Sequence, residues 1–336
     1  MILEPLLLGA VRDMTTRTAS HAGSWYTGDG QVLSEELEGW LNDVNSQIED
    51  VGKIPLAGAR VIIAPYVSQQ RPTAAWAYQA LDVSQAKRVF LLGPSHHKYL
   101  TGCALSKHAT YASPVGNLPL DKDTITALKS KGRLDDMSTG TDEAEHSLEM
   151  HIPYIYHMLS KKFDPAHLPP LVPILVGNTN PNTEKAFGSL LAPYLADPAN
   201  IFVISSDFCH WGSRFGYTYY VPRSSTQVRD GHELSKRDSP SDPPINESIG
   251  RIDKAAMEAI ESGSHDAFLA NLHDTGNTVC GRHPIGIVMA AIDSLRQEAK
   301  LTEDQGFFQF VRYERSSEVK EARDSSVSYG SAFAVM

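Results

Sequence analysis

The stretch Arg88-Val89-Phe90-Leu91-Leu92-Gly93-Pro94-Ser95-His96-His97 decides the fold class. It opens as a short, continuous apolar run, which is typical of a strand buried on both faces of a parallel sheet. It stops at glycine and proline, and two histidines follow directly. Three other runs share this apolar form, at 61–65, 171–177 and 200–206. The sequence therefore predicts four buried strands.

Helical patterns separate these strands. From Leu33 to Ile48, apolar residues recur at steps of three and four, which indicates an amphipathic helix. Further helices are expected at 73–81, 181–195, 253–262 and 284–298, and late strands at 307–313 and 326–335. Strands that alternate with helices favour right-handed βαβ units. We expect an α/β fold with three layers, α/β/α, around a central, mostly parallel sheet.

The chain is expected to form one domain over residues 18–336. Residues 1–17 fit neither the domain pattern nor a targeting signal, and we interpret them as a disordered or artefactual extension. Residues 222–246 are rich in proline, serine and charge and have no apolar period, so they predict a mobile insertion.

Composition excludes several classes of partner. The 336 residues contain 30 Lys and Arg against 40 Asp and Glu, a net charge of -10, which disfavours nucleic acid and anionic membranes. No apolar run approaches the length of a membrane span. Three scattered cysteines indicate a reducing compartment, so we expect a protein of the cytoplasm or also of the nucleus.

Polar residues gather where the predicted strands end. His96 and His97 follow the second strand, Asp207 and His210 follow the fourth, and Cys280 precedes a helix. In open α/β sheets ligands bind beyond the carboxyl ends of the strands, so these segments can meet in one crevice. Adjacent histidines point in opposite directions, so only one of the pair is expected to be a ligand. Asp207 either orients the His210 imidazole or caps a helix. Cys280 is either a reactive thiolate or metal ligand, or a small buried apolar residue.

An acidic segment, 141–151, carries two more histidines. Asp142 and Glu145 are spaced like a helix cap, and His146 then shares a helical face with Glu149. The spacing is not that of His-Glu-x-x-His zinc peptidases, and the glycine patterns of nucleotide sites and the Gly-x-Ser-x-Gly motif of serine hydrolases are absent from the sequence.

Six motifs, in order along the chain, resemble the Memo family, named for a mediator of ErbB2-driven cell motility. They are Ser20-His21-Ala22-Gly23-Ser24-Trp25-Tyr26, Gly93-Pro94-Ser95-His96-His97, Glu145-His146-Ser147-Leu148-Glu149-Met150-His151-Ile152-Pro153-Tyr154, Ser205-Ser206-Asp207-Phe208-Cys209-His210-Trp211-Gly212, Cys280-Gly281-Arg282-His283-Pro284-Ile285-Gly286 and Asp324-Ser325-Ser326-Val327-Ser328-Tyr329. The resemblance runs from about Thr18 to the C-terminus. It implies a fold related to LigB-type class III extradiol dioxygenases and a cytosolic protein whose pocket binds iron or copper, one ion per chain. It further implies copper-dependent redox activity or phosphotyrosine-peptide binding, with His96 and Cys280 as metal ligands and His210 and Asp207 in the same pocket.

The chain departs from the family after the first strand. Where the family has His-Ala-Gly-Tyr, with that histidine as a metal ligand, this chain has Pro65-Tyr66-Val67-Ser68-Gln69. A phenol binds ferric iron or copper but is a weak substitute for imidazole towards divalent metals. Two explanations are open, a real loss of the site and a mis-joined exon; the unmatched first thirteen residues favour the second.

Three functions follow as hypotheses. The first is an iron- or copper-dependent redox protein in signalling or cell motility. His96 and Cys280 hold the metal, His210 is a further ligand or the general acid/base, and Asp207 orients His210 for catalysis. The substrate is not indicated.

The second hypothesis is a non-catalytic signalling module with a degenerate metal site. It would bind a phosphotyrosine peptide or a signalling protein, because Arg282 and His283 at a helix N-terminus suit an anion. The third, an extradiol-type dioxygenase, fits less well, since those enzymes use two histidines and a carboxylate where this chain has Cys280.

Overall fold

The computed structural model describes residues 15–49, 51–66, 71–132 and 134–336. Residues 1–14 of the predicted extension lie outside the described residues. Thr16 and Arg17, the last two residues of the predicted extension, are part of the fold. They form β1 (Thr16–Arg17), which pairs with β7 (Thr110–Tyr111), and Arg17 is fully buried. The predicted extension up to residue 17 is therefore too long, since Arg17 binds the buried carboxylates of Asp142 and Glu149.

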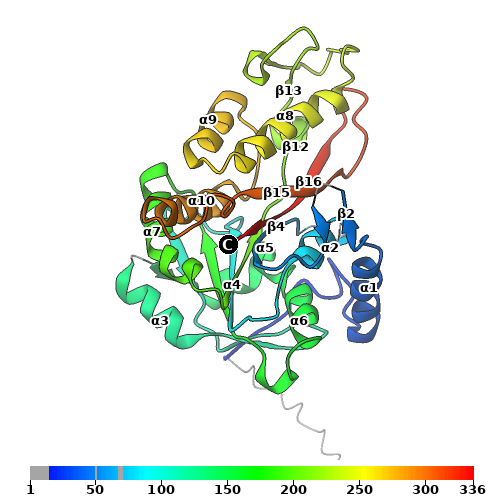
Figure 1. Cartoon of the computed structure of the whole chain (residues 1–336). Coiled ribbons are helices and arrows are strands. Elements are labelled where there is room, and N and C mark those ends of the chain that lie inside the picture. Colours follow the sequence, from blue (N-terminus) through cyan, green and yellow to red (C-terminus); the bar gives the residue numbers. More distant parts are fainter. Residues whose placement is uncertain (1–14, 50, 67–70, 133) are drawn as a thin grey trace, which may run out of the picture.

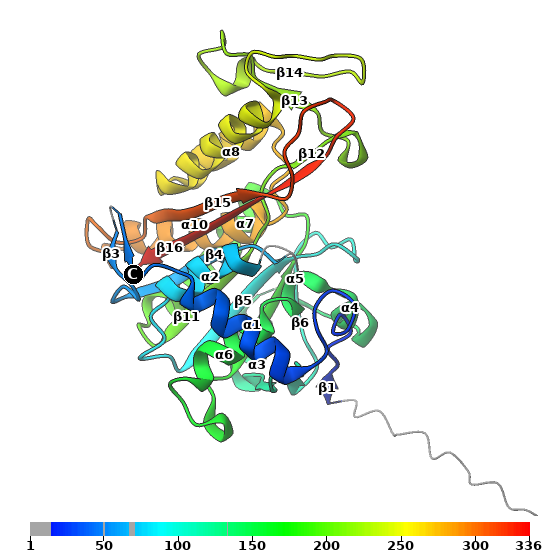
Figure 2. The same cartoon turned by 90° about the vertical axis from the view of Figure 1, so that its right-hand side faces the viewer.

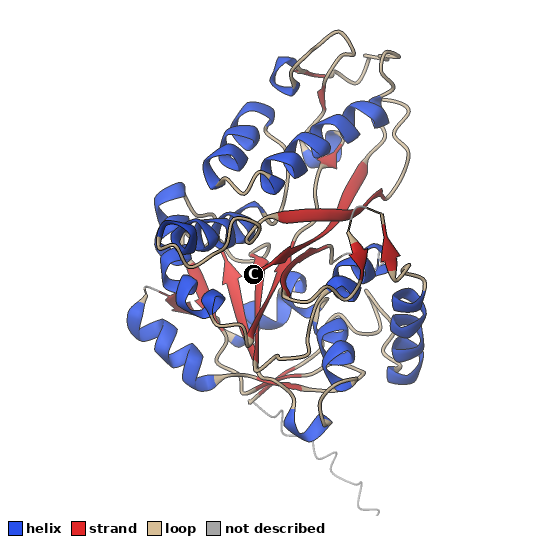
Figure 3. Cartoon of the chain, in the orientation of Figure 1, coloured by secondary structure: helices blue, strands red, loops and turns tan. Residues whose placement is uncertain are grey.

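The main sheet confirms the predicted fold class. Its strand order is β12 (His210–Trp211), β16 (Ser326–Val335), β4 (Ala59–Ala64), β11 (Asn200–Ser205), β5 (Arg88–Pro94), β10 (Leu171–Val176), β6 (Cys103–Leu105) and β9 (Leu134–Asp136), with β15 (Phe308–Arg315) paired to β16. The four central strands, from β4 to β10, run parallel, and β16 and β6 flank them antiparallel. All four buried strands predicted from their apolar runs are present (Figure 3).

Helices cover both faces of this sheet (Figures 1 and 2). On one face α7 (Pro181–Ala196) and α10 (Arg282–Gln297) pack on each other and on β11 and β5. On the other, α2 (Arg71–Ala80) packs on β4 and β16, and α1 (Gly30–Asn42) lies on α2 and α6 (Ile152–Ser160). The arrangement gives the three predicted layers. Gly188 of α7 is needed for the close approach to α10, because a Cβ there would lie 2.7 Å from the Cβ of Ala290.

The remaining elements surround the three layers. They are α3 (Lys122–Lys131), α4 (Thr139–Ala144), α5 (His146–Glu149), α8 (Ile245–Glu261), α9 (His265–Thr275), the paired strands β2 (Gln47–Ile48) and β3 (Gly52–Lys53), β8 (Leu118–Pro119), and the paired strands β13 (Tyr219–Tyr220) and β14 (His232–Glu233). None of the helices in the described part of the chain has the length and apolar content of a membrane span.

The predicted mobile insertion, 222–246, lies at the top of Figure 1. It contains β14, and Leu234 packs in a second small apolar cluster with Trp211 and Tyr220. Helix α8 begins at Ile245, inside the predicted insertion and eight residues before the predicted helix, because Ile245 and Ile249 extend its apolar face into that cluster. The mobility of the segment stays a prediction.

Two local predictions are wrong. Helix α1 ends at Asn42, and the chain then turns into β2, which pairs with β3. Asp142 is not a helix cap: Ser138 caps α4 and Glu145 caps α5, each by accepting a backbone N–H. Asp142 is instead buried and accepts hydrogen bonds from Ser106 and Tyr111, as well as from Arg17.

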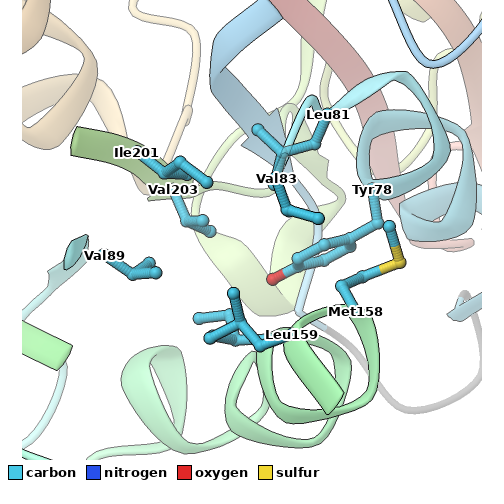
Figure 4. A pocket seen from close by; sticks show the side chains of 9 residues that line it. Tyr78, Leu81, Val83, Val89, Met158, Leu159, Ile201 and Val203 are labelled. Carbon is cyan, nitrogen blue, oxygen red and sulfur yellow. The ribbon is translucent and has the colours of Figure 1, made fainter. Parts of the chain in front are cut away.

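A small apolar cavity lies inside the core, between the sheet, α2 and α6 (Figure 4). Tyr78, Met158 and Val203 are among the side chains that surround it. Its volume of about 10 Å³ is that of roughly one water molecule, so it is a packing gap and no ligand site.

Candidate functional site

A pocket of about 450 Å³ opens beyond the carboxyl ends of β5 and β10 and the N-terminus of α10, at the edge where the sequence predicts a crevice. Two of the chain's six motifs meet in it, the one at 93–97 and the one at 280–286. The residues that line it are Pro94, Ser95, His96, Tyr99, Val176, Gly177, Asn178, Thr278, Val279, Cys280, Arg282 and His283. Predicted ligands His96 and Cys280 therefore share one cavity.

The imidazole of His96 is held by a buried carboxylate, Glu145. Glu145 Oε1 lies 2.9 Å from His96 Nδ1, and its Oε2 accepts the His96 backbone N–H at 2.7 Å. Burial opposes the charged form of this carboxylate, but the hydrogen bonds and charge of His96 outweigh burial and lower the pKa of Glu145 to about 2. A carboxylate on Nδ1 fixes the tautomer that leaves the Nε2 lone pair of His96 available.

Cys280 lies just before α10 and is hydrogen-bonded to Asp207, which follows β11. Its Sγ accepts the Asp207 backbone N–H at 3.1 Å, and its own N–H donates to the Asp207 carbonyl at 3.2 Å. Burial, with Asp207 nearby, raises the pKa of the Cys280 thiol to about 12, so the thiol is protonated at neutral pH without a metal. To bind a metal, the Cys280 thiol must lose its proton, because the thiolate is the form that acts as a ligand.

Tyr66, at the position where the resemblance implies a histidine, reaches both predicted ligands. Its hydroxyl lies 3.3 Å from His96 Nε2 and 3.5 Å from Cys280 Sγ. Its ring is buried, and burial, followed by the nearby Cys280, raises the pKa of the phenol well above its usual value. The rest of the departing turn, 67–70, lies outside the described residues.

The sequence predicted that Asp207 orients His210, but the two side chains have other partners in the structure. Its Oδ1 accepts the Tyr66 backbone N–H at 3.3 Å, and its Oδ2 has no hydrogen-bond partner among the described residues. Complete burial raises the pKa of Asp207 to about 8. The carboxyl group thus holds the Tyr66 backbone and carries a proton near neutral pH.

His210 is held by backbone carbonyls. Its Nδ1 lies 2.9 Å from the Phe208 carbonyl oxygen and 3.2 Å from that of Thr278, so Nδ1 donates and Nε2 keeps the lone pair. Burial lowers the pKa of His210, and the nearby His96 lowers it further. The ring is therefore neutral at pH 7 and lies within electrostatic range of His96.

A group of aromatic side chains beside His96 was missed by the sequence reasoning. The His146 ring stacks on His96 with centroids 4.4 Å apart, and it also contacts Trp25 and His97. Burial, and then His96, lower the pKa of His146 to about 4. His21 reaches the same group, because Glu149 holds its Nδ1 at 2.8 Å. The sequence signal for this group was the Ser-His-Ala-Gly-Ser-Trp-Tyr motif, because its His21 and Trp25 both contact His146.

His96, Glu145 and His146 form a second set of possible ligands, whose ligand atoms lie within 4.8 Å of one another. The hydrogen bonds of Glu145 argue against that set. Both of its oxygens are used by His96, and Oε1 also accepts the Ser147 N–H at 3.1 Å. Glu145 is better suited to orient His96 than to bind a metal itself.

Arg282 and His283, at the start of α10, also line the pocket. Arg282 is exposed there, and His283 Nδ1 lies 2.7 Å from the buried Glu184 carboxylate. Burial opposes the charge on Glu184, but hydrogen bonds from His265 and His283 lower its pKa to about 2. Among the described residues that line the pocket, none is Asp or Glu. An anionic ligand at Arg282 would meet no carboxylate that lines the pocket, and the ionised Glu184 lies behind His283.

A family model described as Memo-like protein matches residues 17–333. This chain belongs to the Memo-like protein family. Zebrafish Protein MEMO1 is 41% identical over 319 residues, covering 94% of this chain and 96% of its own length. Human Protein MEMO1 is 41% identical over 315 residues, covering 93% and 95%. A MEMO1 family protein of Schizosaccharomyces pombe is 38% identical over 322 residues, covering 95% and 98%.

Among solved structures, an uncharacterized Escherichia coli K12 protein aligns with 81% of this Memo-like chain and 99% of its own, at a TM-score of 0.44 and 13% identity.

Within the Memo-like chain itself, the predicted site residues fall into two groups. His96 and Cys280 line the pocket and meet at Tyr66, whereas Asp207 lies behind Cys280 and His210 lies to one side.

Proposed function

We propose that this protein binds one iron or copper ion per chain at His96 and Cys280 and uses it in redox chemistry. Support comes from one observation, the convergence of the His96 Nε2 lone pair and the Cys280 sulfur on the phenol oxygen of Tyr66. Imidazole and thiolate together suit iron and copper better than magnesium or calcium, which prefer oxygen ligands.

The surrounding residues have distinct tasks in this proposal. Glu145 fixes the ring of His96, and the backbone N–H of Asp207 supports the sulfur of Cys280. Iron or copper, when bound, would supply one-electron chemistry. His210, neutral and with a free Nε2, is the proposed acid/base group or a further ligand. The proposal includes a role in signalling or cell motility, which is what the resemblance to the Memo family implies.

Metal content is the direct test. We expect near-stoichiometric iron or copper in the purified chain by plasma mass spectrometry, and none in the double variant His96→Ala, Cys280→Ala. His167→Ala is the matched control, because His167 is 83% exposed at a short helical turn away from the pocket. Unchanged metal content in the double variant, with circular dichroism showing that it is folded, would rule the site out.

The start of α10 favours a second candidate function, a binding module for phosphotyrosine peptides. Arg282 and His283 stand at the start of α10, and no carboxylate from the described residues lines the cavity beside them. We expect saturable binding of a phosphotyrosine peptide, weakened by Arg282→Gln and unchanged by Arg229→Gln on the distant 222–246 segment. No saturation at millimolar peptide would exclude this function.

A further inference from the structure

We infer that Tyr66 is itself a metal ligand in this chain, binding through its phenol oxygen beside His96 and Cys280. The inference rests on the proposed metal site and concerns only the residue that departs from the family. It makes the substitution a change of ligand type and not a loss of the site.

The spacing of the three donor atoms supports this role. Atoms bound to one metal at about 2.0–2.1 Å for nitrogen or oxygen and about 2.3 Å for sulfur, at a tetrahedral angle, lie about 3.3 Å (N to O) and about 3.5 Å (O to S) apart. The Tyr66 oxygen is 3.3 Å from His96 Nε2 and 3.5 Å from Cys280 Sγ. The Tyr66 oxygen therefore already has the separations of a neighbouring ligand from both the imidazole nitrogen and the sulfur.

The Tyr66 hydroxyl donates to Cys280 Sγ at 3.5 Å, and it is the contact with His96 Nε2 that a hydrogen bond explains less well. An O–H···N bond to a ring nitrogen normally places oxygen and nitrogen about 2.7–2.8 Å apart when nothing prevents it. Tyr66 Oη stays half an ångström or so farther from His96 Nε2. Asp207 accepts the Tyr66 N–H, which fixes the backbone from which the phenol extends.

The three side chains are also held in place before any metal arrives. Glu145 fixes His96, the Asp207 N–H fixes Cys280, and the Asp207 carboxyl fixes the Tyr66 backbone. Ligands that are positioned by their own hydrogen bonds lose little freedom when a metal binds. On binding, the phenol and the thiol each release one proton to solvent, so the donor set becomes imidazole, thiolate and phenolate.

A phenolate changes which metal the pocket prefers. It is a hard, anionic oxygen donor, and two anionic ligands favour ferric iron over divalent ions, which carry less charge. Compared with a site that has a histidine at this position, the bound metal in this chain is therefore expected to differ in oxidation state and in colour. The fold is expected to be the same.

The test uses ferric nitrilotriacetate added without oxygen to the metal-free full chain, followed by visible absorption and resonance Raman spectroscopy. A tyrosinate bound to ferric iron gives a charge-transfer band whose Raman lines are phenolate ring modes. We expect these signals in the wild type and their loss in Tyr66→Phe, with ferric affinity lower by about 10–100-fold or more. Tyr99→Phe is the matched control, because Tyr99 lines the same pocket but is 77% exposed, and it should keep the signals.

Tyr66→His separates this inference from the proposed metal site. The inference predicts that this variant binds metal without phenolate modes. Equal ferric binding by wild type and Tyr66→Phe, with no phenolate modes in either, would overturn the inference and leave the metal site standing. Metal uptake by Tyr66→His alone would overturn it by showing that Tyr66 blocks the site. No uptake by any of these folded proteins would overturn the inference and the proposed metal site together.

Discussion

Replacing Arg17 by methionine should destabilise the protein far more than removing an ordinary surface charge. The Arg17 side chain is fully buried and donates to Asp142 Oδ1 at 3.2 Å and to Glu149 Oε2 at 2.7 Å. It also donates to the carbonyls of Asp142 and Glu145, each at 3.0 Å. Methionine fills similar space but supplies no donor, so two buried carboxylates lose their cation.

The expected magnitude follows from which partners remain. Asp142 keeps hydrogen bonds from Ser106 and Tyr111, and Glu149 keeps those from Tyr26 and His21. Those bonds stabilise the carboxylates only in part, because removing one member of a buried ion pair costs about 3–5 kcal/mol. We expect Arg17→Met to lower the free energy of unfolding by that amount.

Urea unfolding followed by circular dichroism measures this change. Lys185→Met is the control, since the Lys185–Asp266 pair is 54% and 78% exposed and should contribute less than about 1 kcal/mol. In the Arg17→Met background, Glu149→Gln should recover part of the loss, with a coupling of about 0.5–3 kcal/mol. A cost below about 1 kcal/mol for Arg17→Met, or strict additivity with Glu149→Gln, would refute the reasoning.

Three other predictions concern separate parts of the molecule. The first is Glu145→Gln, which leaves one acceptor oxygen where His96 uses two. Its affinity for iron or copper, measured by competition with a coloured chelator, should fall about 10–100-fold. Unchanged affinity would contradict the orienting role of Glu145. Folding lowers the Glu184 pKa from 4.5 to about 2, so its stabilisation is complete above pH 4.5 and is lost as the pH falls towards 2. The stability difference between wild type and Glu184→Gln should therefore shrink over that interval, and a constant difference in urea midpoint would speak against it. Gly188→Ala should cost about 1–3 kcal/mol by forcing α7 and α10 apart, whereas Gly39→Ala, with open space around it in α1, should stabilise by up to about 1 kcal/mol, both read from thermal midpoints.

The central fold was predictable because its signals are local. Continuous apolar runs such as 88–94 and 200–205 mark strands buried on both faces, and residues beyond them, including His96, reach the pocket edge. Convergence of His96 with Cys280 also followed, since the carboxyl ends of parallel strands share one edge of a sheet.

Partner choice at the site was not predictable, because it depends on contacts between distant segments. The Asp207-x-x-His210 spacing suggested a direct contact, but His210 starts β12, and pairing with β16 directs its ring to backbone carbonyls. Glu145 was noticed only as a possible cap, since nothing local to it indicates His96, which is 49 residues away in sequence. Apolar periodicity carries no information about such pairs.

The position of β16 has a consequence for how the protein is made on the ribosome. This strand, formed by Ser326–Val335, pairs with both β4 and β12, which leave the ribosome long before it. A nascent chain that ends before Ser326 already holds Tyr66, His96 and Cys280, yet β4 has an open edge and β12 has no partner. Domains are synthesised at about 5–20 residues per second, so this edge waits for seconds with unpaired backbone groups. The sheet beside the pocket is thus completed only by a segment translated after Tyr66, His96 and Cys280, and a chaperone has most unpaired backbone to protect in the interval before that.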